Sequence, residues 1–190
     1  MKICAFMGSP RKDGNTGLLL REAVRGIEEE GFSVQVFDLN SMNIRPCQNC
    51  GGCNETGVCI NRDDMDQIYD AIRSSDRIIL ASPIYFFALS AQTKLMIDRC
   101  QCFWCEKYLL RKPLAESLDG RKGLLLLVGG MMADTGVQCS EACARAFFRT
   151  ISFPEHDVLS YLGIDKKGDI LKHKTALEDA YDAGKRLIEI

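Results

Sequence analysis

Four cysteines lie close together in the first third of the chain: Cys47, Cys50, Cys53 and Cys59. Two of the residues between them are Gly51 and Gly52, which free the backbone so that one short loop can wrap several corners of a metal cluster. Compact thiolate runs of this kind commonly hold iron–sulfur clusters, whereas structural zinc more often takes two separated cysteine pairs. We therefore expect a [4Fe–4S] cluster on these four cysteines. Zinc, redox-active thiols and inert thiols are the alternatives.

A second stretch with chemical potential is Gly8-Ser9-Pro10-Arg11-Lys12-Asp13-Gly14-Asn15-Thr16. Its small residues let backbone N–H groups approach an anion, Arg11 adds positive charge, and the helix that follows contributes the partial positive charge of its N-terminus. Neither a dinucleotide fingerprint nor a Walker A loop is present. The stretch is typical of a phosphate-binding loop for a mononucleotide, to which Ser9, Asn15 and Thr16 donate hydrogen bonds. The alternative is that Asn15 or Thr16 only caps the helix.

A third stretch, Ser82-Pro83-Ile84-Tyr85-Phe86-Phe87, places three aromatic residues where a loop would ordinarily be polar. Tyr85 can stack on a flavin ring, and Pro83 with nearby amides can bond its heteroatoms, so we assign Ile84 and Phe86 to the same binding loop. Alternatively, Phe86 and Phe87 pack into the core or a subunit interface. Gly129 and Gly130 are expected to let backbone approach the same ring, although a plain turn explains them equally well.

These stretches follow strands in an alternating pattern of strands and helices. Short apolar runs predict strands at 2–7, 33–38, 77–81, 122–128 and 156–162, and helical periodicity or position predicts helices near 20–27, 65–72, 90–102, 138–150 and 177–188. Right-handed crossovers then give a parallel sheet between two helical layers, an α/β flavodoxin-like three-layer sandwich of order 2-1-3-4-5. Ligands bind beyond the carboxyl ends of strands 1 and 3. The cysteine run leaves strand 2 at that same edge, so we expect cluster and flavin to lie close enough for electron exchange.

The composition of the 190-residue chain, 46% hydrophobic and 26% charged, is that of an ordinary globular protein. We expect a single domain over residues 1–190, with a cysteine-rich insertion at 40–62. The formal charge of −2 offers no long-range attraction for nucleic acid or anionic lipid, and no apolar run is long enough to span a membrane. Ten cysteines do not suggest a disulfide scaffold, so reduced or metal-bound thiols in the cytoplasm are expected.

Five further cysteines lie in two groups outside the first run. Cys100, Cys102 and Cys105 form a second group, and Cys139 and Cys143 are one helical turn apart, where they would share a helix face. The simplest interpretation of these five is that they are small buried apolar side chains. A second metal or thiol-redox site is the alternative. Asp63 and Asp64, just after the first run, are expected to supply negative charge to a helix N-terminus rather than to bind a hard metal.

With these patches in this order, the chain resembles the iron–sulfur flavoprotein branch of the NADPH-dependent FMN reductase-like, flavodoxin-like family. The matching residues are Gly8-Ser9-Pro10-Arg11 with Asn15-Thr16, the four-cysteine run, Asp63-Asp64, Ser82-Pro83-Ile84-Tyr85, and Lys94 with Asp98-Arg99. The resemblance implies a homodimer or homotetramer with a [4Fe–4S] cluster on the four cysteines. It also implies FMN bound by Ser9, Arg11, Asn15, Thr16, Ser82, Pro83 and Tyr85.

The function expected from these features is redox chemistry. FMN exchanges two electrons or one, and an iron–sulfur cluster passes single electrons. We therefore predict a flavin-dependent oxidoreductase that couples two-electron to one-electron transfer, with ferredoxin or a small reducible molecule as acceptor. One alternative is an NAD(P)H-dependent FMN or quinone reductase with a structural metal, although no nicotinamide-binding motif is visible. Another is a non-enzymatic module that senses a metal or redox state.

Overall fold

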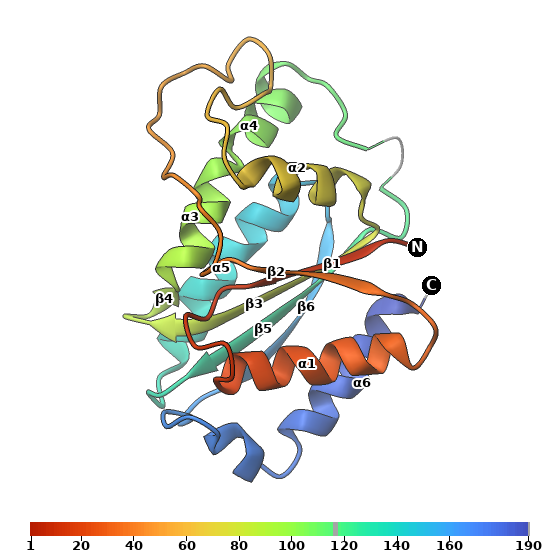
Figure 1. Cartoon of the computed structure of the whole chain (residues 1–190), viewed down its shortest axis with the longest axis vertical. Helices are drawn as coiled ribbons and strands as arrows, with labels where there is room; N and C mark the ends of the chain where they lie inside the picture. Colours follow the sequence, from red (N-terminus) through yellow and green to blue (C-terminus); the bar gives the residue numbers. More distant parts are fainter. Residues whose placement is uncertain (116–117, 190) are drawn as a thin grey trace.

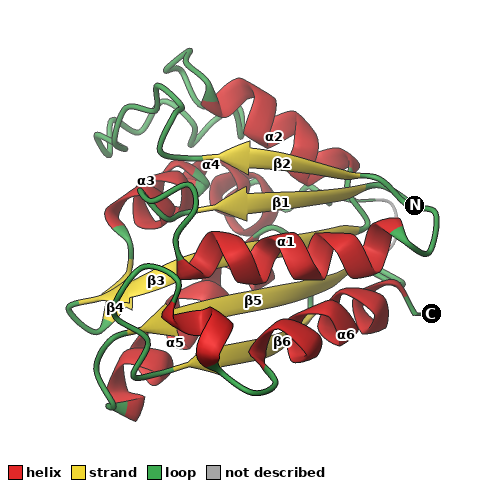
Figure 2. Cartoon of the chain, turned by 60° about the horizontal axis from the view of Figure 1, so that its bottom comes forward, coloured by secondary structure: helices red, strands yellow, loops and turns green. Residues whose placement is uncertain are grey.

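The computed structural model describes residues 1–115 and 118–189. Five parallel strands form a central sheet in the order β2-β1-β3-β5-β6. Counted without the short β4, this is the predicted 2-1-3-4-5 order, and helices cover both faces of the sheet (Figures 1 and 2). The flavodoxin-like fold class is therefore confirmed. That residues 1–190 form a single domain stays a prediction, since residues 116, 117 and 190 lie outside the described residues.

The strands are β1 (Ile3–Met7), β2 (Val34–Asp38), β3 (Arg77–Tyr85), β4 (Ala88–Leu89), β5 (Lys122–Gly129) and β6 (Glu155–Tyr161). The helices are α1 (Asn15–Glu28), α2 (Met65–Ser74), α3 (Ala91–Arg99), α4 (Gln101–Trp104), α5 (Asp134–Thr150) and α6 (Ala176–Ile188). Two short helical turns complete the set: the π-helical η1 (Cys105–Leu109) and the 3-10 turn η2 (Asp169–Lys172).

Alternation along β1 explains the three layers. Successive side chains of a strand point to opposite faces, so Cys4 and Phe6 join a core with α2, α3 and α5, whereas Ile3, Ala5 and Met7 join one with α1 and α6. Both faces of the strand are apolar, as expected for a parallel sheet that is covered on each side. Helices therefore pack against the sheet from both sides.

Two predicted boundaries are wrong at places that matter for the site. The third strand was expected to end at Ala81, but β3 continues to Tyr85 because β5 pairs with it as far as Ile84 and Gly129. The chain then reverses and β4 pairs antiparallel with β3, a hairpin that the sequence did not predict. The single helix expected over 90–102 is instead α3, α4 and η1 in succession, with a break at Cys100.

None of the helices in the described part of the chain combines the length and the hydrophobicity that a bilayer-spanning helix needs.

Candidate functional site

The predicted phosphate loop is clamped where β1 ends. Its first residue, Gly8, donates its N–H to the Ala81 carbonyl at 2.8 Å and accepts a hydrogen bond from the Ser90 hydroxyl at 2.6 Å. A Cβ atom at Gly8 would collide with the Thr93 hydroxyl. Only glycine therefore fits this position without a shift of the Thr93 side chain or of the loop, which lies between β3 and the start of α3.

The loop then wraps around the N-terminus of α1. The buried hydroxyl of Ser9 accepts the N–H of Arg11 at 3.1 Å, which folds the loop back on itself, while Arg11 is exposed. The N-cap is Gly14, with no side-chain capping hydrogen bond. The alternative that Asn15 or Thr16 merely caps α1 is therefore wrong. A helix N-terminus without a side-chain cap is an arrangement that can bind an anion through the N–H groups of its first turn.

Asn15 connects this loop to the segment after β6. Its amide donates to the Lys166 carbonyl at 2.9 Å and accepts the N–H groups of Gly168 at 2.9 Å and Ile170 at 3.3 Å. These three bonds hold the start of α1 in place. A direct contact between the Asn15 side chain and a phosphate stays a prediction, as does one from Thr16, which is also buried.

A cleft of about 560 Å³ opens beside the hairpin that joins β3 and β4. It is lined by Ile84, Tyr85, Phe86, Phe87, Gly129, Gly130, Met131, Ala133, Gly136, Leu162 and Asp165. The structure thus brings together five residues that the sequence assigned to a flavin ring: Ile84, Tyr85, Phe86, Gly129 and Gly130. Volume and apolar lining suit a small organic ligand. Sequence reasoning missed Leu162 and Asp165 because no motif marks the end of the last strand.

The hairpin turn itself is strained. Phe86 and Phe87 have φ values of 49° and 62°, the left-handed conformation that a two-residue hairpin turn requires and that asparagine or glycine usually supplies. Phe86 is fully exposed, so it does not pack into the core of this chain. Bulky residues are rare in this conformation, and such strain is concentrated at functional sites. The turn holds two aromatic side chains at the mouth of the cleft.

Two predicted cofactor contacts lie within the protein rather than in the cleft. Ser82 is fully buried, and its hydroxyl accepts the N–H of Ser90 at 3.0 Å and donates to the Pro83 carbonyl at 2.8 Å. Pro83 is a buried residue of β3. Their side chains position the hairpin and the start of α3, while direct contact with a flavin stays a prediction for both.

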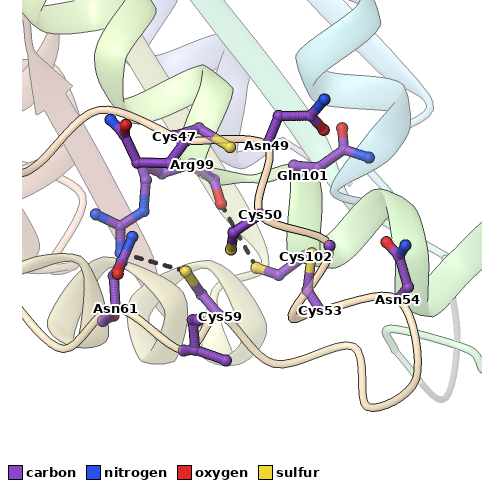
Figure 3. Close-up of a pocket in the computed structure, with 13 residues that line it drawn as sticks. Cys47, Asn49, Cys50, Cys53, Asn54, Cys59, Asn61, Arg99, Gln101 and Cys102 are labelled. Atoms are coloured by element: carbon purple, nitrogen blue, oxygen red, sulfur yellow. Dashed lines mark hydrogen bonds between the residues drawn. The ribbon is translucent and has the colours of Figure 1, made fainter.

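The cysteine loop leaves the end of β2, passes over α4 and returns to α2 (Figure 1). Cys47, Cys50, Cys53 and Cys59 all line one pocket, as predicted from their spacing. A fifth cysteine, Cys102 of α4, lines the same pocket, and Figure 3 shows several of these sulfur atoms directed toward its centre. The pocket is therefore lined by thiols from two separate segments, the cysteine loop and α4.

As the thiols stand, no three histidine, cysteine, aspartate or glutamate side chains in the described ranges converge enough to hold one metal ion. A single zinc ion needs four donors around one point. A cluster of several irons binds its thiolates at separate corners. Cysteines arranged around a pocket therefore suit an iron–sulfur cluster better than they suit a single zinc ion.

Burial, followed by the neighbouring thiol of Cys105, raises the pKa of Cys53 to about 12. Metal binding must displace that proton.

Arg99, the last residue of α3, holds both ends of the cysteine loop. Its guanidinium pairs with Asp63 at 2.6 Å and donates to the carbonyl oxygens of Arg45 at 2.8 Å and Asn61 at 3.1 Å. It also donates to the Cys59 sulfur at 3.5 Å (Figure 3). Burial alone would raise the pKa of Asp63, but the bonds from Arg99 and from backbone N–H groups hold it below its usual value. No sequence pattern predicted this ion pair.

Both aspartates after the run also fix the loop. Asp63 accepts the N–H of Met65 at 3.1 Å, which agrees with its expected place at the start of α2, but its ion pair lies with Arg99. Asp64 accepts the N–H of Asn43 at 2.7 Å and so closes the base of the loop.

The second cysteine group is not a separate site. Cys100, Cys102 and Cys105 are all buried, as the simplest interpretation expects. Cys102 also lines the pocket of the first run, and the Cys105 sulfur lies 3.6 Å from that of Cys53. These two thiols therefore lie against the first run rather than around a separate centre. The other pair is on α5 and does not line this pocket. Cys139 is exposed and Cys143 is half-buried, so the interpretation as buried side chains is wrong for Cys139.

One helix links the two candidate sites. Ser90, just before α3, contacts the phosphate loop, and Arg99, at its other end, contacts the cysteine loop. At 1.5 Å per residue, the nine residues of α3 span about 14 Å. The insertion does leave the sheet at the expected edge (Figures 1 and 2). The length of α3 separates the contact that Ser90 makes with the phosphate loop from the contact that Arg99 makes with the cysteine loop.

Comparison with known proteins agrees with this arrangement. A family model for NADPH-dependent FMN reductase matches residues 1–148. An iron–sulfur flavoprotein of Clostridioides difficile is 30% identical over 156 residues, which cover 78% of this chain and 69% of the relative. The chain belongs to the NADPH-dependent FMN reductase family.

Within this FMN reductase family, other sequence relatives are named iron–sulfur flavoproteins. One from Methanocaldococcus jannaschii is 44% identical over 99 residues, or 52% of this chain and 51% of the relative. One from Methanosarcina thermophila is 36% identical over 130 residues, or 68% of this chain and 64% of the relative. The chain spans about half to two thirds of the length of these two curated relatives.

Solved structures show the same FMN reductase family fold. An NAD(P)H:quinone oxidoreductase from Methanothermobacter marburgensis superposes with a TM-score of 0.77 at 17% identity, covering 100% of this chain and 98% of that one. An FMN-dependent NADH-azoreductase from Bacillus anthracis, solved with FMN, gives a TM-score of 0.70 at 14% identity, with each chain covered completely. At this level of identity the likeness establishes the fold alone.

Proposed function

We propose that the chain is a flavin-dependent oxidoreductase that holds FMN and a [4Fe–4S] cluster and couples two-electron to one-electron transfer. The observation that carries this proposal is α3, which joins a phosphate loop at one end to a pocket of five cysteines at the other. The names of the sequence relatives, iron–sulfur flavoproteins, support the same combination of cofactors.

The residues present fit FMN. Ser9, Arg11, Thr16 and the N-terminus of α1 would hold its phosphate, since they offer buried N–H groups, hydroxyls and one exposed positive charge. The apolar cleft between the hairpin and Gly129-Gly130 would take the ring system. Bound there, FMN supplies hydride and single-electron chemistry. The hairpin aromatics would exclude water from the cleft, and the two glycines would allow the backbone to approach the ring.

The residues present also fit an iron–sulfur cluster on Cys47, Cys50, Cys53 and Cys59. Such a cluster supplies single-electron transfer when bound. Arg99 donates a hydrogen bond to the Cys59 sulfur and carries positive charge beside the thiols, so it would help to balance the negative charge of a thiolate-bound cluster. Asp63 pairs with the guanidinium and keeps it in place.

We propose a homodimer or homotetramer, with NAD(P)H or a reduced partner as donor and ferredoxin or a small reducible molecule as acceptor. Exposed apolar side chains near the cleft, namely Phe86, Met131 and Met132, support an oligomer or partner contact there. We also propose a cytoplasmic location, because all ten cysteines are free thiols, the form that a reducing compartment maintains.

A second candidate is an NAD(P)H-dependent reductase of quinone or another planar oxidant, in which the metal is structural. The observation that favours it is the open cleft with exposed aromatic side chains in its lining, which suits a planar ligand. The names of two solved structures of the same fold, a quinone oxidoreductase and an azoreductase, support this candidate.

Anaerobic purification separates the candidates. The proposed function requires FMN, iron and labile sulfide in the pure protein, with an absorption spectrum of both cofactors that bleaches on reduction. Zinc in place of iron, together with rapid NAD(P)H oxidation, would support the second candidate. Protein that binds no flavin even after supplementation would contradict both and favour a sensing module.

A further inference from the structure

Cys53 has a sulfur neighbour outside the predicted ligand set. The sulfur atoms of Cys53 and Cys105 are 3.6 Å apart, although the residues are 52 positions apart in the chain. Cys105 is also oriented by polar neighbours: its thiol donates to the Asn54 side-chain oxygen at 3.4 Å and accepts from the Gln101 amide at 3.7 Å. The metal pocket described above does not use Cys105.

The fold holds these two thiols together. Gly57, four residues after Cys53, has a φ of 73° and donates its N–H to the Cys53 carbonyl at 2.9 Å. A Cβ atom at Gly57 would lie 2.9 Å from that of Glu106, so the loop is seated directly on the residue after Cys105. Glu106 in turn pairs with Arg73 of α2. The turn that starts at Cys105 is π-helical, a rare form that often marks functional positions.

We propose that Cys53 and Cys105 are a redox-active dithiol that closes to a disulfide when the pocket lacks its metal. The sulfur atoms need to approach by about 1.5 Å to reach disulfide length. Closure withdraws Cys53 from the four thiols proposed to bind the cluster, so oxidation and cluster assembly compete for one sulfur atom. The competition rests on the proposed function, whereas closure of the disulfide does not.

The oxidant that the chemistry requires is a small-molecule disulfide. Cys53 is partly exposed and Cys105 is buried, so Cys53 is the thiol that the oxidant reaches first. The Cys53 sulfur, having lost its proton, attacks one sulfur of the oxidant and releases the other half as a thiol. The Cys105 sulfur then attacks Cys53, its proton leaves, and the second half departs as a thiol. Two protein thiols are oxidised, and one small disulfide is reduced to two thiols.

Peptide mapping tests closure directly. The full chain is stripped of iron with a chelator, incubated with oxidised glutathione, alkylated and digested without reductant. We expect mass spectrometry to find the Cys53 peptide joined to the Cys105 peptide, and the two separated after treatment with dithiothreitol. Cys105→Ala should abolish the joined peptide, while Cys139→Ser, which changes an exposed cysteine on α5, should retain it. Cys53 alkylated after oxidation, or joined mainly to another cysteine, would overturn the proposal even if the variants fail to fold.

Iron uptake tests the competition. The oxidised wild-type chain should lose most of its iron incorporation during anaerobic reconstitution and regain it after dithiothreitol, whereas Cys105→Ala that is kept reduced throughout should load as the reduced wild-type chain does. Equal uptake by the joined and the reduced wild-type chain would refute the competition. A joined pair in a chain that never binds iron would instead contradict the proposed cluster and support the dithiol. FMN titration of each sample serves as the control for folding.

Discussion

Arg99 and Asp63 form an ion pair in which both side chains are only 1% exposed, with the charged atoms 2.6 Å apart. The pair joins the end of α3 to the end of the cysteine loop, two segments that neither helix nor sheet bonding connects. Arg99 also donates hydrogen bonds to the loop at Arg45, Asn61 and Cys59. Its guanidinium group therefore both orders the loop and places a positive charge beside the thiols.

Removing one partner of this pair should be costly. Asp63→Asn leaves the guanidinium buried without its counter-charge, and breaking a buried pair in this way costs about 3–5 kcal/mol. Urea unfolding of the variant should show a loss in the free energy of unfolding of that size. The matched control is Asp66→Asn, whose partner Arg62 is exposed, and for which a loss of about 0–1 kcal/mol is expected. Equal losses in the two variants would contradict the importance of the buried pair.

The same carboxylate predicts a dependence of stability on pH. The pKa of Asp63 is lowered in the folded chain, so the unfolded state binds a proton more readily than the folded state does. Its contribution is therefore complete above the ordinary aspartate pKa of about 4 and is lost as pH falls through the lower folded value. The stability difference between wild type and Asp63→Asn should be constant near neutral pH and shrink in acid. A difference that grows as pH falls would reverse the sign and refute this account.

Removing the backbone strain at Phe86 should raise the stability of the protein but weaken its binding of FMN. Phe86→Asn puts a residue that tolerates left-handed backbone into a turn that requires it, which should raise the free energy of unfolding by about 1 kcal/mol. The same change removes an aromatic side chain from the mouth of the cleft, so FMN should bind more weakly in a fluorescence titration. Leu171→Asn, at another exposed apolar residue, is the control and should alter neither. Unchanged FMN affinity in Phe86→Asn would place the ring elsewhere.

The sequence predicted what depends on local pattern and strand order. Alternating apolar runs were sufficient for the order of the parallel sheet, and the spacing of the four cysteines was sufficient to place them around one pocket. What it missed depends on contacts between distant segments. β3 extends to Tyr85 only because β5 pairs with it, and the partners Arg99 and Asp63 are 36 positions apart. The contacts of Cys102 and Cys105 with the first cysteine run depend on the break between α3 and α4 at Cys100, which the sequence pattern did not predict.

The close contact between Gly8 and Thr93 allows the position of the phosphate loop to be tested without changing a residue proposed to contact FMN. Gly8→Ala places a methyl group against the Thr93 hydroxyl, and overpacking of this kind costs about 1–3 kcal/mol. The loop should move away from α3, so FMN affinity should fall together with the free energy of unfolding. Adding Thr93→Ala makes room for the methyl group and should restore much of the FMN affinity, measured by the same fluorescence titration. If the double variant binds FMN no better than Gly8→Ala, the collision with Thr93 is not what links this glycine to the cofactor.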